Sequence, residues 1–190
     1  LRPKMPIYRL MTKLSRSIMP QYGGLQVVEY QDPDIQPLLG LLNQEFPNWS
    51  SSKIKSYMNL VTSKANDISG VLVAKNQAEY YVGILIYTFQ QIDSNKIDNS
   101  CSNGNKKKAS NIFVVENLIA SSLILQSQVF LSLVESGIEI AENHMCDYIE
   151  LPKFDTESYD LLKEKYKNQV TDFKDFRTYL KLNKSLEKHL

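Results

Sequence analysis

The spacing of apolar residues changes along the chain, and each change predicts a new element. Apolar and polar residues alternate over residues 25–30, which predicts a strand. Helical spacing follows over residues 35–46, where Asp34 can cap the first amides and Pro47 ends the helix. The same spacing resumes over residues 50–61 and predicts a second helix. The expected inner positions of this second helix are Ile54, Tyr57, Met58, Leu60 and Val61.

A longer succession of strands and helices is predicted for the rest of the chain. Residues 69–75 and 80–90 read as a β-hairpin across a short polar link. Residues 111–120 are nearly continuously apolar, so we expect this strand to be central and buried on both faces. A long amphipathic helix over residues 127–144 follows, with Met145 as the last residue of its apolar stripe. The remaining elements are a buried strand, a helix and a final strand, over residues 147–151, 156–166 and 176–182.

The composition is that of one ordinary globular domain of the α/β class. Of the 190 residues, 43% are hydrophobic and 23% are charged, and the formal net charge is +1, so no nucleic-acid partner is expected. Cys101 and Cys146 are the only cysteines, which excludes a disulfide framework and a four-cysteine zinc site; no metal site is predicted. No apolar run has the length of a transmembrane segment, so a soluble, cytoplasmic protein is the first expectation.

Residues 1–24 differ from the rest because they contain five basic residues and no acidic one. This bias resembles an organellar transit peptide, which would place the protein in a mitochondrial or other organelle matrix. The alternative is a basic arm that packs on its own domain or on a partner. Residues 93–110 are rich in Asn, Ser and Lys and predict a flexible loop inside a domain of residues 25–182, with residues 183–190 as a tail.

The central strand and the two elements after it carry a family resemblance. Val115-Glu116-Asn117-Leu118-Ile119-Ala120 is followed without a gap by the long helix and by Tyr148-Ile149-Glu150-Leu151. This order resembles the GNAT acetyltransferases, in which a strand with the pattern Ile-Glu-x-Leu-x-Val precedes an Arg/Gln-x-x-Gly-x-Gly/Ala loop. The detailed match covers about residues 112–151, and the general organisation covers about residues 25–182. The resemblance implies a mixed, mostly antiparallel central sheet flanked by helices, and acetyl-CoA as the cofactor.

In the same alignment the acetyl-CoA phosphate loop has the family's length but not its side chains. Leu125 stands where Arg or Gln is usual, and Gln128 and Phe130 stand where small residues are usual. Small residues let the pyrophosphate approach the backbone amides at the helix start, so both side chains are expected to weaken that cradle. Side chains of the loop can still donate hydrogen bonds to phosphate; alternatively, Phe130 fills the cofactor space as core. The cofactor positions that the resemblance implies are Leu118, Ala120, Leu125, Gln126, Ser127, Gln128, Val129 and Phe130.

Direct acetyl transfer needs a base for the attacking amine and an acid for the CoA thiolate. Glu116 resembles the acidic residue of the family's strand and is the candidate base; otherwise it is a solvated carboxylate. The family's acid is commonly Tyr in a pattern Asn-x-x-Ala-x-x-x-Tyr, but aligning Asp155 and Ser158 with Asn and Ala puts Leu162 at the Tyr position. Tyr159 is therefore the candidate acid by proximity, with core packing as its alternative.

Two functions of different classes follow from these residues. The first is an acetyl-CoA-dependent N-acetyltransferase that acts on a primary amine of a small molecule or peptide, in which Trp49 lines the acceptor groove or serves as a packing anchor. The second is a catalytically inactive GNAT-like domain, a possible pseudoenzyme with a degenerate phosphate loop, that serves as a structural or partner-binding subunit. His144 is expected to cap the end of the long helix in either case. The oligomeric state stays open.

Overall fold

The structure is a computed structural model that describes residues 24–63, 68–93, 109–121, 126–153, 156–167, 169–172 and 178–182. Nearly all of the predicted basic arm and of the Asn- and Lys-rich loop, and the whole predicted tail, lie outside these residues. The strands are β1 (Gln26–Glu29), β2 (Ser69–Lys75), β3 (Tyr81–Asp93), β4 (Ala109–Ala120), β5 (Tyr148–Leu151), β6 (Val170–Asp172) and β7 (Thr178–Lys181). The helices are the 3-10 turn η2 (Gln36–Leu38), α2 (Leu39–Glu45), α3 (Ser51–Val61), α4 (Gln126–Asn143) and α5 (Thr156–Lys165).

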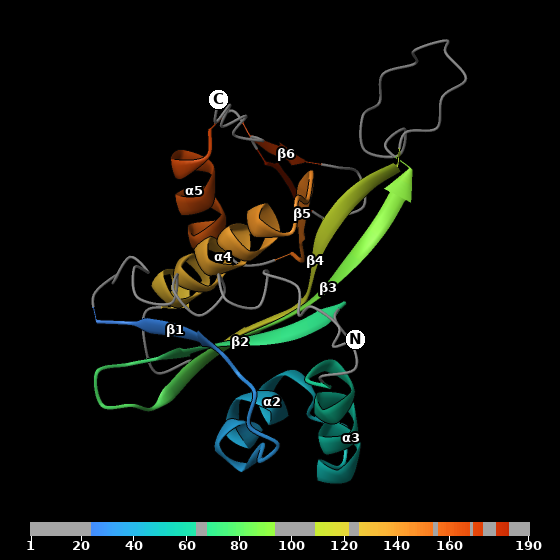
Figure 1. Cartoon of the computed structure of the whole chain (residues 1–190). Coiled ribbons are helices and arrows are strands. Elements are labelled where there is room, and N and C mark those ends of the chain that lie inside the picture. Colours follow the sequence, from blue (N-terminus) through green and yellow to red (C-terminus); the bar gives the residue numbers. More distant parts are fainter. Residues whose placement is uncertain are drawn as a thin grey trace, which may run out of the picture.

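The described strands form one seven-stranded sheet in the order β1-β2-β3-β4-β5-β7-β6. Every neighbouring pair is antiparallel except β4 and β5, which run parallel because α4 carries the chain back across the sheet. This arrangement confirms the predicted mixed, mostly antiparallel sheet flanked by helices. Figure 1 shows α4 and α5 on one side of the sheet and α2 and α3 on the other.

Each face of the sheet therefore has its own hydrophobic core. On one face, Leu85 and Phe113 are fully buried together with Leu133 of α4. On the other face, Ile84 and Ile86 pack with residues of α2 and α3. The alternation of Ile84, Leu85 and Ile86 between the two cores explains why these strands are apolar at consecutive positions: both sides are covered.

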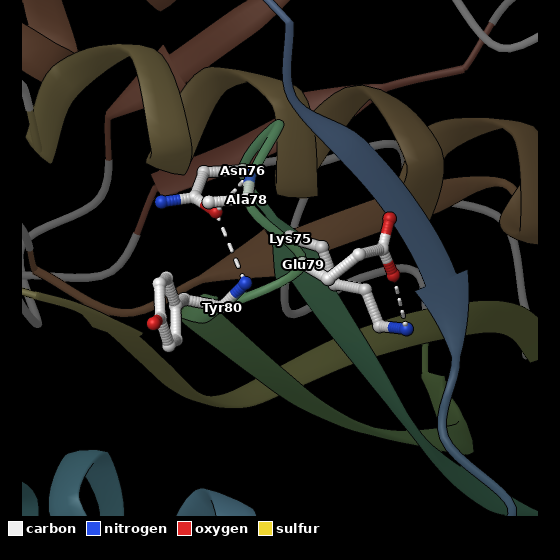
Figure 2. A network of polar contacts seen from close by, with 5 residues as sticks. All are labelled: Lys75, Asn76, Ala78, Glu79 and Tyr80. Atoms are coloured by element: carbon white, nitrogen blue, oxygen red, sulfur yellow. Dashed lines mark hydrogen bonds and ion pairs between the residues drawn. The ribbon is translucent and has the colours of Figure 1, made fainter.

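The turn between β2 and β3 confirms the predicted polar link. The Asn76 side-chain oxygen accepts hydrogen bonds from the backbone amides of Ala78 and Tyr80, each at 3.0 Å. The Lys75 ammonium pairs with the Glu79 carboxylate at 3.2 Å, and Glu79 has a positive φ of 63°. Figure 2 shows how this network closes the hairpin. The Asn76 side chain thus provides the hydrogen-bond acceptor for two backbone amides of the turn, where the pairing between the strands ends.

The structure corrects several positions of the predicted elements. Leu60, expected on the inner side of α3, is 64% exposed, and Met145, expected on the apolar stripe of α4, is 67% exposed. Met145 follows the end of α4 and has a positive φ of 56°, which turns its side chain away from the stripe. The strand β6 was not predicted, because three residues are too short for a recognisable alternation.

Other expectations about the helix ends are confirmed. The Asp34 carboxylate accepts a hydrogen bond from the Gln36 amide at 3.0 Å, although the first turn is a 3-10 turn. The Nδ1 atom of His144 lies 2.9 Å from the Ile140 carbonyl oxygen, as expected for a side chain that caps the end of α4. No helix in the part of the chain that the structure describes is long and apolar enough to cross a membrane.

Candidate active site

The strands β4 and β5 pair over only a short stretch, so β4 extends beyond its partner. Residues Ile112–Val114 are in register with Tyr148–Glu150, and within the described residues Val115–Ala120 pair with β3 alone. Among the residues that the structure describes, no strand therefore pairs with the side of β4 that would face β5 from Val115 onward. We call this divergence of β4 from β5 the opening.

A β-bulge in β4 lies at the same place. Tyr87 of β3 is in register with Val115, and Ile86 is in register with Asn117, so Glu116 is the extra residue. Because two residues of a bulge oppose one residue of the partner strand, the alternation of side chains shifts by one position. Glu116 and Asn117 consequently both lie on the face that α2 and α3 cover, as their hydrogen bonds confirm.

The Glu116 carboxylate is exposed and is held by two neutral donors of β3. The Thr88 hydroxyl donates a hydrogen bond to Glu116 Oε1 at 2.8 Å, and the Gln90 amide lies 3.4 Å from the same oxygen. Neither donor carries a charge. Thr88 and Gln90 therefore orient the carboxylate but do not neutralise its negative charge. Such a group can accept a proton from a ligand that reaches the opening.

A second hydrogen-bonded chain joins α2, α3 and β4 beside Glu116. The Tyr57 hydroxyl donates to Asn117 Oδ1 at 3.2 Å, and the Asn117 amide donates to Glu45 Oε1 at 3.3 Å. Burial and the nearby charge of Glu116 raise the pKa of Tyr57 above its ordinary value. Tyr57 therefore keeps its proton at neutral pH and acts as a hydrogen-bond donor at this site.

The sequence indicated Glu116 but not its partners. Thr88 and Gln90 are polar residues two positions apart in β3, so they share one face, and that spacing was a usable signal. Glu116 and Asn117 are adjacent polar residues within an apolar run, which is a signal of a bulge. Tyr57 was expected only as an inner-face residue, because its partner lies far away in the sequence.

Trp49 is partly buried and belongs to an aromatic cluster between α2 and α3. Its ring stacks on Phe46 at a centroid distance of 4.5 Å and meets Tyr57 edge-on at 5.7 Å. All three rings pack against the core on this face of the sheet. The packing role expected for Trp49 is therefore confirmed, and its contact with Tyr57 also places it next to the site.

The start of α4 is the expected phosphate end of the cofactor site. The helix begins at Gln126, so Gln128 and Phe130 lie in its first turns, whereas Leu125 lies outside the described residues. Gln128 is exposed and Phe130 is half-buried against the core of this face.

A carboxylate lies beside this helix start. The Ser127 hydroxyl donates a hydrogen bond to Glu157 Oε1 of α5 at 3.3 Å. The amides of the first turn of a helix attract anions, and here Glu157 supplies a negative charge from the chain itself. A phosphate group would meet this charge when it approached the same amides.

Val129 packs closely over a glycine of β3, and this contact supports a stability prediction. A methyl group on Gly83 would lie 2.3 Å from Val129 Cγ1 and 3.2 Å from the Ile119 carbonyl oxygen. We expect Gly83→Ala to lower the free energy of unfolding by about 1–3 kcal/mol, because the helix cannot shift without losing other core contacts. Urea denaturation followed by circular dichroism measures the change.

The matched control is the double variant Gly83→Ala/Val129→Ala, which removes the clashing methyl groups of Val129. Its destabilisation should be smaller than the sum of the two single effects, because the sites are in contact. Strictly additive effects would contradict the proposed contact between Gly83 and Val129.

Tyr159 and Glu116 come from opposite sides of the sheet. Tyr159 is half-buried on α5, which packs against α4, and the Lys163 ammonium lies 5.6 Å from its ring centroid. Leu162, at the position where the family has Tyr, is buried in the core of this face. Tyr159 therefore stays a prediction for the acid. The strand positions Leu118 and Ala120 lie beyond the point where β4 leaves β5, half-buried and buried respectively.

Comparisons with known proteins bear on the fold. No protein-family model matches the chain, and no curated protein matches it in sequence. Among solved structures, the aminoglycoside acetyltransferase AAC(6′)-Iy bound to the bisubstrate analogue CoA-S-monomethyl-acetylneamine is 13% identical, with a TM-score of 0.53 over 74% of this chain and 86% of that one.

Two further structures have the same degree of similarity. The 6′-N-acetyltransferase AAC(6′)-Ih from Acinetobacter baumannii is 14% identical, with a TM-score of 0.53 over 80% of this chain and 97% of that one. An acetyltransferase from Trypanosoma brucei is 13% identical, with a TM-score of 0.52 over 74% and 90%. The divergence of β4 from β5, the layers of helices and these matches together show that the chain has the GNAT-like acyltransferase fold.

Proposed function

We propose that this chain is an acetyl-CoA-dependent N-acetyltransferase that acts on a primary amine. The observation that carries the proposal is the Glu116 carboxylate at the bulge of β4. It lies where β4 leaves β5, on the face of the sheet that α2 and α3 cover, which we take as the acceptor face. The structural neighbours named as acetyltransferases support the reaction class, and the CoA analogue bound to one of them supports the cofactor.

The residues at the opening fit acetyl-CoA with one departure. The unpartnered side of β4 around Leu118 and Ala120 would hold the pantetheine arm, and the first turn of α4 over residues 126–130 would meet the phosphates through its amides and the side chains of Gln126, Ser127 and Gln128. Leu125 precedes this turn and is proposed to contact the same group. The departure is Glu157, whose charge lies next to Ser127.

In the proposed reaction, this chain supplies the base and the geometry. When bound, acetyl-CoA supplies a thioester whose carbonyl carbon forms a bond to the amine nitrogen while its bond to sulfur breaks. Glu116 accepts the proton that the nitrogen loses, and Thr88 holds the accepting oxygen in place. Tyr57 holds the acceptor face through Asn117, and Tyr159 is the proposed donor of the proton that the thiolate takes up.

A second function is supported by the start of α4. Phe130 packs against the core and Glu157 accepts a hydrogen bond from Ser127, so a protein side chain and a protein charge occupy the neighbourhood that the phosphates need. On this reading the chain is a catalytically inactive GNAT-like domain that binds a partner.

Calorimetric titration with acetyl-CoA decides between the two functions. We expect measurable binding, and we expect Glu157→Gln to tighten it about two- to fivefold, because one negative charge at a helix start is removed. Glu164→Gln, on the same helix and exposed, is the matched control and should leave the affinity unchanged. The absence of binding in both the native chain and Glu157→Gln would favour the inactive domain.

A further inference from the structure

The aromatic cluster of α2 and α3 already holds an ammonium group. The Lys53 Nζ atom lies 4.0 Å from the centroid of the Trp49 ring. Phe46 stacks on the indole with an interplanar angle of 20°, so Lys53 must lie over the opposite face. Because Lys53 is exposed, that face of Trp49 is reached from solvent. A cation over an aromatic face is attracted by the negative charge density of the ring.

The Trp49 ring is connected to the bulge of β4 through two side chains, Tyr57 and Asn117. The Tyr57 ring meets Trp49 edge-on, and the Tyr57 hydroxyl reaches Asn117, the neighbour of Glu116 in the bulge. The Glu45 carboxylate binds the same Asn117 amide at 3.3 Å. Trp49, Tyr57, Asn117 and Glu116 therefore form one series of neighbouring residues, with a cation-attracting ring at one end and a carboxylate at the other.

The two ends of this path treat an amine differently. Glu116 can take a proton, so an amine beside it can become a nucleophile. Trp49 offers no proton acceptor, because its indole nitrogen is a donor only, so an ammonium over its ring keeps its charge. One end is suited to a reacting amine and the other to an amine that only anchors the molecule.

Building on the proposed function, we infer that the acceptor is a linear aliphatic diamine. One of its amines reacts beside Glu116, and its second ammonium takes the place of the Lys53 ammonium over Trp49. The intramolecular contact of Lys53 is then a competitor that the substrate displaces.

The chain provides its own optical probe for this inference, because Trp49 is its single tryptophan. The intrinsic fluorescence of the full chain is titrated, without acetyl-CoA, with 1,6-diaminohexane and with hexylamine, which has the same length and one ammonium fewer. We expect the diamine to bind about tenfold more tightly than hexylamine. Equal affinities, or no fluorescence change with the diamine, would overturn the inference.

Variants of α3 test the competition directly. Lys53→Met should tighten diamine binding about two- to fivefold, because the competing ammonium is gone, whereas the matched Lys55→Met, also exposed on α3, should not. An unchanged affinity in Lys53→Met would contradict displacement. Both changes are at exposed positions, so the fold is retained.

Transfer kinetics separate this inference from the proposed function. Trp49→Phe should raise KM for the diamine and leave kcat nearly unchanged, because the lost contact lies away from the reacting amine. Acetyl transfer to hexylamine and diamine with equal KM would refute the diamine while leaving the acetyltransferase intact. Diamine binding at Trp49 without any acetyl-CoA binding would refute the acetyltransferase and leave the cation site.

Discussion

Replacing Glu116 with Gln is expected to lower kcat for acetyl transfer by about 100-fold or more, the usual contribution of a positioned general base. Glutamine has the same shape and still accepts a hydrogen bond from Thr88, but its amide cannot take up the amine proton. Acetyl-CoA affinity should not change, because the side chain lies on the acceptor face of the sheet. A thiol-release assay at saturating amine measures the effect.

The control for this change is Glu142→Gln, which removes an exposed carboxylate from α4 far from the bulge and should keep full activity. Thermal unfolding should place both variants close to the native chain, since neither carboxylate is buried. Full activity in Glu116→Gln would mean that Glu116 is a solvated strand carboxylate and that another group takes the proton.

The fold was predictable from the sequence where apolar spacing is strong and the elements are long. The strand over residues 111–120 and the helix over residues 127–144 were placed within one or two residues of β4 and α4. Each of these two elements buries one or both of its faces, so the spacing of its apolar residues identifies it in the sequence. Within the described part of the chain, the three residues of β6 pair with β7 alone, and such a short strand at the edge of a sheet leaves no period to detect.

Only the part of the candidate site that lies within one recognised strand was predictable. Glu116 could be proposed from its place in the strand, because the strand itself was recognised. Its environment depends on the register of β3 and β4, which the turn and the bulge set together. Asn117 of β4 is distant in sequence from Tyr57 of α3 and Glu45 of α2, so only the packed structure shows their hydrogen bonds.

At the start of α4, the proposed phosphate end of the cofactor site, the sequence identified the residues but not their surroundings. Leu125, Gln128 and Phe130 were recognised as departures from the family pattern, but the sequence could not show where these side chains lie. The structure gives part of the answer: Phe130 packs on the core, and Glu157 of the next helix reaches Ser127. The charge of Glu157 thus adds to the Gln128 and Phe130 side chains as an obstacle to phosphate at the amides of α4, and Glu157→Gln removes that charge alone.

Phe113→Ala is expected to lower the free energy of unfolding by about 3–5 kcal/mol, the usual cost of removing a buried aromatic ring. Phe113 is fully buried, stacks on Tyr87 at a centroid distance of 4.5 Å and meets Phe89 at 5.6 Å. A Cβ atom on Gly137 of α4 would lie 3.2 Å from the ring, so the helix rests directly on it. Urea denaturation followed by circular dichroism measures the loss.

The position of Phe113 gives this variant a second consequence. Phe113 is in register with Ile149 in the short parallel pairing that precedes the opening between β4 and β5. A cavity there loosens the helix that starts at the phosphate end and the strand that carries Glu116, so acetyl-CoA affinity should fall with stability. Phe113→Leu keeps most of the volume and should cost less than about 1.5 kcal/mol. If Phe113→Ala cost as little as Phe113→Leu, the ring would not be the support on which α4 and β4 rest.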